Sequence, residues 1–156
     1  LNMTLKSGLS LIVFLALVAL VSVTGSKFLP GPWYEALTKP EWTAPNWLFP
    51  PAWAILYVLI AVAGWRVYER QGFGPALCVW IVGLALNGIW SVLMFGQHQI
   101  GLAAVDIVLL WATVVAFIAL NWRTNRIASL LFVPYLVWIT YATALNIAVY
   151  VLNPQA

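Results

Sequence analysis

The residues best suited to hold a ligand are concentrated in segment 33–53, which reads WYEALTKPEWTAPNWLFPPAW and contains four tryptophans, one tyrosine and four prolines. An indole offers a large flat surface and one N–H donor, whereas proline stiffens the backbone and removes a donor. The segment therefore predicts a preformed aromatic surface for a ligand. The alternative is an interfacial belt, because Trp and Tyr favour the headgroup depth of a bilayer.

Two further aromatic residues extend this segment into the next apolar stretch. Trp53 and Tyr57 are four residues apart, so they share one side of a helix. Belt residues are usually spread over several helix ends, whereas Trp33, Tyr34, Trp42 and Trp47 crowd one segment. This concentration favours a lined pocket over a belt.

Two later stretches carry polar and aromatic residues at helical spacing. In 127–151, Trp138, Ala142 and Leu145 fall on one stripe, and Ala142 leaves room for a planar guest or for a neighbouring helix. In 75–96, Asn87 and Ser91 share a face with Trp90 and are expected to hydrogen-bond across helices, as is Asn146.

Small residues in 75–96 also suggest a contact between two copies of the chain. Gly83 lies one turn from Asn87, with Ala76 further along the helix. A smooth surface of this kind is a candidate homodimer contact.

Conventional catalytic or metal chemistry has little support. Asp106 is the single carboxylate well inside an apolar stretch, where it either relays protons or pairs with a neighbouring Asn or Arg. His98 is the sole histidine and is expected to be a solvated loop residue rather than a haem ligand, so we expect no metal site. Cys78 has no intrachain partner for a disulfide, and no phosphate loop or Ser-His-Asp set is recognisable.

The composition places these residues in a bilayer. The chain has 156 residues, 64% of them hydrophobic and 7% charged, with a mean hydropathy of +0.97. Soluble domains carry roughly 25% charged residues. We expect one domain over residues 1–156, and because the seven basic residues are scattered we expect no nucleic-acid binding.

Five apolar stretches, at about 7–27, 47–68, 75–96, 100–121 and 127–151, are each long enough to cross the bilayer as a helix. Lipid offers the backbone no hydrogen-bond partners, so the expected fold is all-α, an integral membrane bundle of five transmembrane helices. The alternative for the first stretch is a signal peptide, but this stretch is longer than the apolar core of such a peptide. The later loops are short, which predicts that consecutive later helices are antiparallel neighbours. Pro134 is expected to kink the last helix or to mark its first turns.

The distribution of basic residues predicts the orientation. Lys6, Arg66, Arg70, Arg123 and Arg126 would share one face of the membrane, and Lys27 and Lys39 the other. The positive-inside rule then places the N-terminus in the cytoplasm and the Trp-rich segment outside. Helical spans favour a bacterial inner membrane over an outer one.

The ordered motifs resemble those of the tryptophan-rich sensory protein family, TspO, whose animal relatives are the translocator protein or peripheral benzodiazepine receptor. The resemblance spans essentially the whole chain. It rests on Trp33-Tyr34-Glu35-Ala36-Leu37, Lys39-Pro40, Trp42, Pro51-Ala52-Trp53, Leu86-Asn87, Trp90-Ser91, Phe95-Gly96, Val133-Pro134-Tyr135, Trp138, Ala142 and Leu145-Asn146.

The resemblance implies a commonly dimeric five-helix bundle that binds porphyrins, such as protoporphyrin IX or haem, and isoquinoline or benzodiazepine-type ligands beneath the first loop. It places Trp33, Tyr34, Trp42, Trp53, Asn87, Trp138 and Ala142 at the pocket, with Tyr57 at a position that is aromatic elsewhere in the family. No basic residue follows Arg126, so the family's proposed sterol pattern, a Tyr followed by Lys or Arg, is incomplete and sterol binding is doubtful.

The residues and the resemblance are compatible with three functions. The first is carriage, buffering or sensing of a tetrapyrrole, with Lys39 and loop amides near the ligand's propionates. The second is light- and oxygen-dependent breakdown of protoporphyrin, in which Trp33, Tyr34 and Trp138 would exchange electrons or hydrogen with the excited ring. The third is a lipid- or sterol-binding scaffold that acts through a partner protein.

Overall fold

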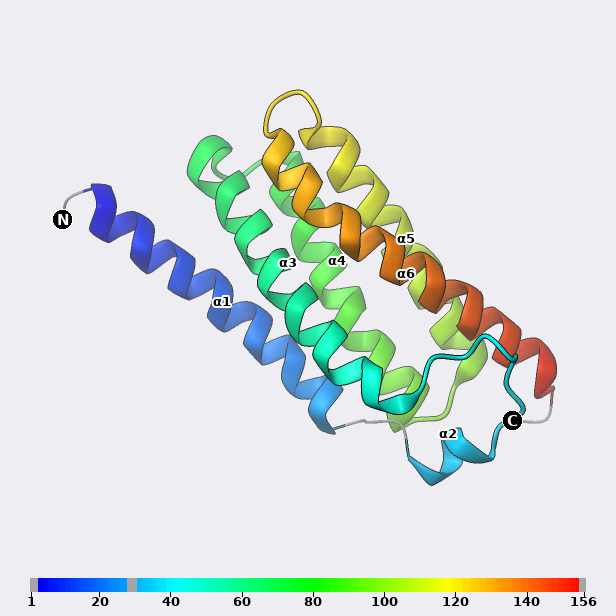
Figure 1. Ribbon diagram of the computed structural model, residues 1–156. Coiled ribbons are helices and arrows are strands. Elements are labelled where there is room, and N and C mark those ends of the chain that lie inside the picture. Colours follow the sequence, from blue (N-terminus) through cyan, green and yellow to red (C-terminus); the bar gives the residue numbers. More distant parts are fainter. Residues whose placement is uncertain (1–2, 28–30, 155–156) are drawn as a thin grey trace.

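The computed structural model describes residues 3–27 and 31–154, without the side chains of residues 3 and 25–27, so the side chain of Lys27 lies outside the described part. Its five long helices are α1 (Met3–Lys27), α3 (Phe49–Gln71), α4 (Pro75–Ser91), α5 (Ile100–Asn121) and α6 (Arg126–Leu152), which form one bundle (Figure 1). All five have the length and apolar composition of membrane spans. The predicted fold class, an all-α integral membrane bundle, is confirmed.

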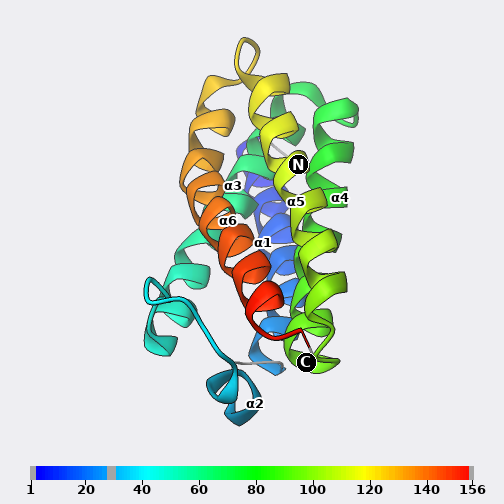
Figure 2. The same cartoon turned by 90° about the vertical axis from the view of Figure 1, so that its right-hand side faces the viewer.

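The five long helices close a ring. Helix α1 packs against α3 and α4, α3 packs against α6, and α5 packs against both α6 and α4. Figure 2 shows α1 behind α5 and α6, on the far side of the bundle. The prediction that consecutive helices pack side by side is confirmed for α4 with α5 and for α5 with α6. Helices α3 and α4 contact each other less, because α3 packs mainly against α1 and α6 and α4 mainly against α5 and α1.

One indole mediates the contact between α3 and α4. The Trp80 ring lies so close to Gly64 that a Cβ there would overlap it. Trp80 Nε1 also donates a hydrogen bond to the carbonyl oxygen of Ile60, at 2.9 Å. A glycine is therefore required at this crossing because an aromatic ring occupies the space of its missing side chain.

Local sequence signals set the helix ends. Gly72 adopts a φ of +66° directly after α3, a conformation that favours glycine, and Pro75 opens α4 in the first turn, where its missing N–H costs nothing. Asn125 caps α6 by accepting a hydrogen bond from the amide of Ala128. Pro134 lies inside α6, which runs continuously through it.

The Trp-rich segment is not a plain loop. It contains the short helix α2 (Pro32–Ala36) and the 3₁₀ turn η1 (Asn46–Leu48), and it lies at the end of the bundle opposite the α5–α6 turn (Figure 1). At the same end, α4 continues into a π-helical turn, η2 (Val92–Gly96). We call residues 31–48 the connector.

The proposed small-residue dimer surface is occupied within the single chain. Ala76, Gly83 and Asn87 are all buried, and a Cβ at Gly83 would come within 2.8 Å of Thr113 Oγ1 on α5. These residues face neighbouring helices of the same chain, which argues against them as the contact. Formation of a homodimer itself stays a prediction.

Candidate functional site

The connector is fastened to α6 by the hydroxyl of Tyr141. This hydroxyl accepts a hydrogen bond from the amide of Ala44 at 2.6 Å and donates to the carbonyl oxygen of Trp42 at 3.2 Å. The Trp42 and Tyr141 rings meet edge to face, with centroids 5.8 Å apart. A single side chain on the last helix thus fixes both the backbone and an indole of the connector.

Lys39 has a different role from the one predicted. Its ammonium group donates to the carbonyl oxygens of Tyr34, Glu35 and Leu37, at 2.8, 3.1 and 3.2 Å, and lies 4.8 Å from the centroid of the Tyr34 ring. An ammonium has three N–H donors. Lys39 therefore closes the turn after α2, and this arrangement does not favour it as the partner of a ligand carboxylate.

An aromatic cluster lies between α3 and α6. Trp53 stacks on Tyr57 with ring centroids 5.3 Å apart and meets Trp138 edge-on at 6.2 Å. Phe49, at the start of α3, meets Trp138 from another direction at 5.7 Å. The four-residue spacing of Trp53 and Tyr57 predicted their shared face, and the structure adds Trp138 to it.

Asn87 joins this cluster to the buried interior. Its Oδ1 accepts a hydrogen bond from the Tyr57 hydroxyl at 3.3 Å, and its Nδ2 donates to the Tyr135 hydroxyl at 2.7 Å. One amide on α4 thus links α3 to α6. Both Asn87 and Tyr135 are buried, which makes these bonds expensive to break.

A second amide bridge lies deeper in the bundle. Asn146 on α6 accepts from Trp90 Nε1 at 2.8 Å and donates to the carbonyl oxygen of Ile100 at 3.0 Å. The expectation that Asn87 and Asn146 hydrogen-bond across helices is confirmed. Trp90 and Asn146 therefore act in packing between helices.

A groove of about 490 Å³ runs between α3, α6 and the connector. It is almost entirely apolar, and its lining comprises Trp42, Ala44, Leu48, Ala52, Ile55, Leu56, Pro134, Val137, Trp138 and Tyr141. Its size is in the range typical of small-molecule sites. Trp138 lines the groove, and its buried Nε1 has no hydrogen-bond partner among the described residues.

Trp33 and Tyr34 pack at a different place, against the π-helical turn and the residues after it. The Trp33 ring stacks on His98 with centroids 3.9 Å apart and planes 4° apart, and Tyr34 meets Phe95 edge to face at 5.6 Å. The Tyr34 side chain is only 2% exposed, and this burial raises its pKa to about 12, with a smaller contribution from Tyr141. His98 is exposed, as expected, but it is stacked rather than free in solvent.

The structure thus divides the predicted site residues into groups. Trp53, Tyr57, Asn87 and Trp138 are linked by direct contacts, and Trp42 joins Trp138 at the groove. Trp33 and Tyr34 have no ring contact with Trp53 or Trp138 in the described part of the chain. Ala142 is buried on α6 and lies one turn beyond Trp138.

Sequence reasoning missed the residues that hold the connector. The sequence predicts no role for Tyr141 or for Asn153, whose side chain exchanges two hydrogen bonds with the main chain of Thr38. It also predicts no role for Phe49, which contacts Trp138. The signal that they matter is a hydrogen bond or ring contact to a residue about a hundred positions away, which no local spacing encodes.

Asp106 lies on α5 and is 6% exposed. One of its oxygens, Oδ2, is buried and has no hydrogen-bond partner among the described residues. The predicted pairing of Asp106 with Asn or Arg is therefore absent at that oxygen, and a role in proton transfer stays untested.

The geometry defines a class of protein: a multi-pass α-helical membrane protein with an aromatic groove beneath a structured, tryptophan-rich connector. The TspO/MBR family profile matches residues 10–152, nearly the whole chain. The chain belongs to the TspO/MBR family, as its motifs indicated.

Named relatives are similar over most of their length. "Protein CrtK" of Rhodobacter capsulatus is 40% identical over 91% of this chain and 91% of its own, and "Tryptophan-rich sensory protein" of Cereibacter sphaeroides is 37% identical over 91% and 90%. The human "Translocator protein" is 33% identical over 81% of this chain and 79% of its own.

Proposed function

We propose that this protein binds porphyrins and related tetrapyrroles in the aromatic groove and acts in their transport, sensing or regulation. The observation that supports the proposal is the position of Trp138. This residue lines the groove, meets Trp53 and Phe49 edge-on, and has a buried indole N–H without an acceptor in the described part of the chain. A planar ligand in the groove would stack on this ring, and a polar edge that reached the indole N–H would give the donor an acceptor.

The energetics are compatible with this role. Aromatic contacts contribute ~0.5–1.5 kcal/mol each beyond the area they bury. Three or four such contacts, together with burial of apolar surface in a groove of about 490 Å³, reach the ~8 kcal/mol of micromolar binding. Isoquinoline and benzodiazepine-type compounds are smaller flat aromatics and would occupy the same groove.

The experiment is a titration of the detergent-solubilised protein with protoporphyrin IX, followed by quenching of intrinsic fluorescence. Trp138→Phe keeps an aromatic ring but removes the N–H, and we expect it to weaken binding about five- to tenfold. Trp111→Phe is the matched control, because Trp111 lies on α5 and donates to Thr140, away from the groove. Equal affinities for the wild type and Trp138→Phe would disprove the assignment.

A second candidate function is light- and oxygen-dependent degradation of protoporphyrin IX. It is favoured by the contiguous oxidisable rings of Trp53, Tyr57 and Trp138. An excited porphyrin would take one electron from an indole, and dioxygen would add to the porphyrin radical anion that results. Return of one electron from this adduct to the indole radical cation would restore the indole and leave an oxygenated macrocycle. Illumination of the bound complex should then yield a discrete product that free porphyrin under the same lamp does not, and Trp138→Phe should slow its formation.

The membrane context is part of the proposal. The five basic residues assigned to one face favour a cytoplasmic N-terminus, an outward connector and a bacterial inner membrane. In a Cys78→Ser background, Glu41→Cys should react with an impermeant maleimide in intact cells, and Thr124→Cys only after permeabilisation. The reverse pattern would invert the orientation. A homodimer is also proposed, and crosslinking in native membranes tests it.

A further inference from the structure

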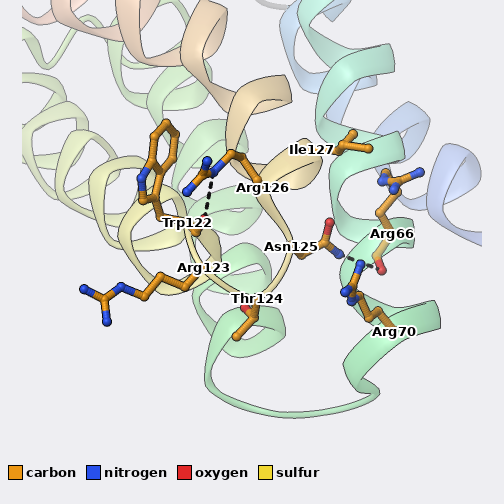
Figure 3. A pocket seen from close by; sticks show the side chains of 8 residues that line it. All are labelled: Arg66, Arg70, Trp122, Arg123, Thr124, Asn125, Arg126 and Ile127. Carbon is orange, nitrogen blue, oxygen red and sulfur yellow. Dashed lines mark hydrogen bonds between the residues drawn. The ribbon is translucent and has the colours of Figure 1, made fainter.

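A second hollow lies at the other end of the bundle, beside the α5–α6 turn. It has a volume of about 330 Å³, and four of its lining residues are arginines: Arg66, Arg70, Arg123 and Arg126. Figure 3 shows Arg66 and Arg70 on α3 to one side of Asn125, with the other two arginines on the other side. Two segments far apart in the sequence, the end of α3 and the α5–α6 turn with the start of α6, therefore contribute arginines to one hollow.

No described carboxylate lines this hollow. Glu35 and Glu41 belong to the connector at the opposite end, Asp106 is buried in α5, and Glu69 is exposed on α3 but is not part of the lining. Four arginines that line one hollow without a carboxylate among them make the hollow a favourable place for an anion.

Arg66 supplies the second, independent observation. Its backbone carbonyl accepts a hydrogen bond from Asn125 Nδ2 at 3.1 Å, which ties the end of α3 to the start of α6. Its side-chain Nε is buried and has no hydrogen-bond partner among the described residues. A buried charged donor without an acceptor is costly, and a ligand oxygen would remove that cost.

The start of α6 adds a favourable field. The side chain of Asn125 accepts a hydrogen bond from the amide of Ala128. Arg126 and Ile127 lie in the first turn of α6, where helix amides lack intrahelical acceptors. The positive end of the helix dipole attracts phosphate groups at such a position. Arg126 is held there by its Nε, which donates to the Trp122 carbonyl at 3.2 Å, and by the Trp122 ring 4.7 Å away.

We propose that this arginine-lined hollow binds a phosphate-bearing anion, with the headgroup phosphate of an anionic phospholipid as its source. Exposed Trp122 and Ile127 border the same hollow and offer apolar surface for the start of an acyl chain, which a free phosphate would not need. Arginines that only set membrane orientation would be separately solvated, whereas the buried Nε of Arg66 needs an acceptor.

The test measures lipid retention by the full chain in native mass spectrometry. The protein is exchanged from detergent into mixed micelles containing equal amounts of phosphatidylglycerol and phosphatidylcholine. We expect phosphatidylglycerol to be retained about tenfold more than phosphatidylcholine. A second arm titrates inorganic phosphate by calorimetry without lipid; if phosphate binds there and phosphatidylglycerol is not preferred, the site takes a soluble anion instead of a headgroup.

Variants separate a built site from general charge. Arg70→Gln, at an exposed position, should lower retention about tenfold, and Arg66→Lys, which keeps the charge but loses Nε, should also lower it. Lys6→Gln is the matched control, because Lys6 is exposed and lies beside Ser7, whose carbonyl accepts from Trp65 at the same end of the bundle.

The outcomes are exclusive. Selective loss of phosphatidylglycerol in Arg70→Gln and Arg66→Lys, with Lys6→Gln unchanged, supports the site. Equal losses in all three variants show nonspecific attraction and overturn the proposal. Absence of both lipid preference and phosphate binding also overturns it. Because Arg70 is exposed, its variant keeps the test valid even if a change at Arg66 disturbs folding.

Discussion

The side chain of Asn153 and the main chain of Thr38 form a reciprocal pair of hydrogen bonds. The amide of Thr38 donates to Asn153 Oδ1 at 3.0 Å, and Asn153 Nδ2 donates to the carbonyl oxygen of Thr38 at 2.8 Å. In this pair each partner donates one hydrogen bond and accepts one, as paired residues of neighbouring β-strands do, but one partner here is a side-chain amide. It joins the residue after α6 to the connector over the bundle.

Replacing Asn153 should therefore loosen the connector around Thr38 without unfolding the bundle. Asn153→Ala removes both bonds and the Nδ2 bond to the carbonyl oxygen of Val149 at 2.8 Å, for a local cost of about 1–2 kcal/mol at this half-buried position. Hydrogen exchange around Thr38 should rise several-fold, while exchange at Ala44, whose amide still donates to Tyr141, and in α4 and α5 stays unchanged. Gln97→Ala, which removes an exposed amide side chain at the same end, is the control, and equal effects of the two changes would contradict the role given to Asn153.

Asn87 should be important for stability as well as for the site. Asn87→Ala leaves the Tyr135 hydroxyl buried without its 2.7 Å partner, which should cost about 1–3 kcal/mol and lower the midpoint of thermal unfolding. The double change Asn87→Ala with Tyr135→Phe should cost less than the sum of the single changes, because the stranded hydroxyl is then absent. Strict additivity would show that the bond contributes nothing.

The pH dependence of stability should carry a signature of Tyr34. Burial raises the pKa of its hydroxyl from 10.0 to about 12, so the folded state holds this proton more tightly than the unfolded state. The contribution is complete below pH 10, and stability declines as pH rises between 10 and 12. Tyr34→Phe should lose this decline, seen as a smaller fall in the unfolding midpoint from pH 9 to 11. Identical pH slopes for both proteins would refute the assignment.

The crossing of α3 and α4 should tolerate no side chain at Gly64. Gly64→Ala places a methyl group against the Trp80 ring and should destabilise the protein by about 1–3 kcal/mol through overpacking. Gly8→Ala is the matched control, because nothing lies within 4 Å of a Cβ at that helical position. Thermal unfolding in one detergent compares the two, and a neutral Gly64→Ala would mean that Trp80 can move aside.

The sequence alone predicts the five crossings, because a backbone in lipid must satisfy its own hydrogen bonds and long apolar runs can do so only as helices. It also determined local pairs such as Trp53 and Tyr57, since helical spacing alone places them together. The family motifs further indicated Asn87 and Trp138 as site residues.

Which of these residues contact one another depends on the packing of the helices. Tyr141 fastens Trp42, Asn87 bridges two tyrosines, and Trp33 stacks on His98, all through contacts between segments distant in the chain. Likewise, Lys39 donates to main-chain carbonyl oxygens of its own turn, and Gly83 is buried against α5. Such pairings depend on the order of helices in the ring and on their rotation, which hydropathy cannot specify because lipid and protein are both apolar neighbours.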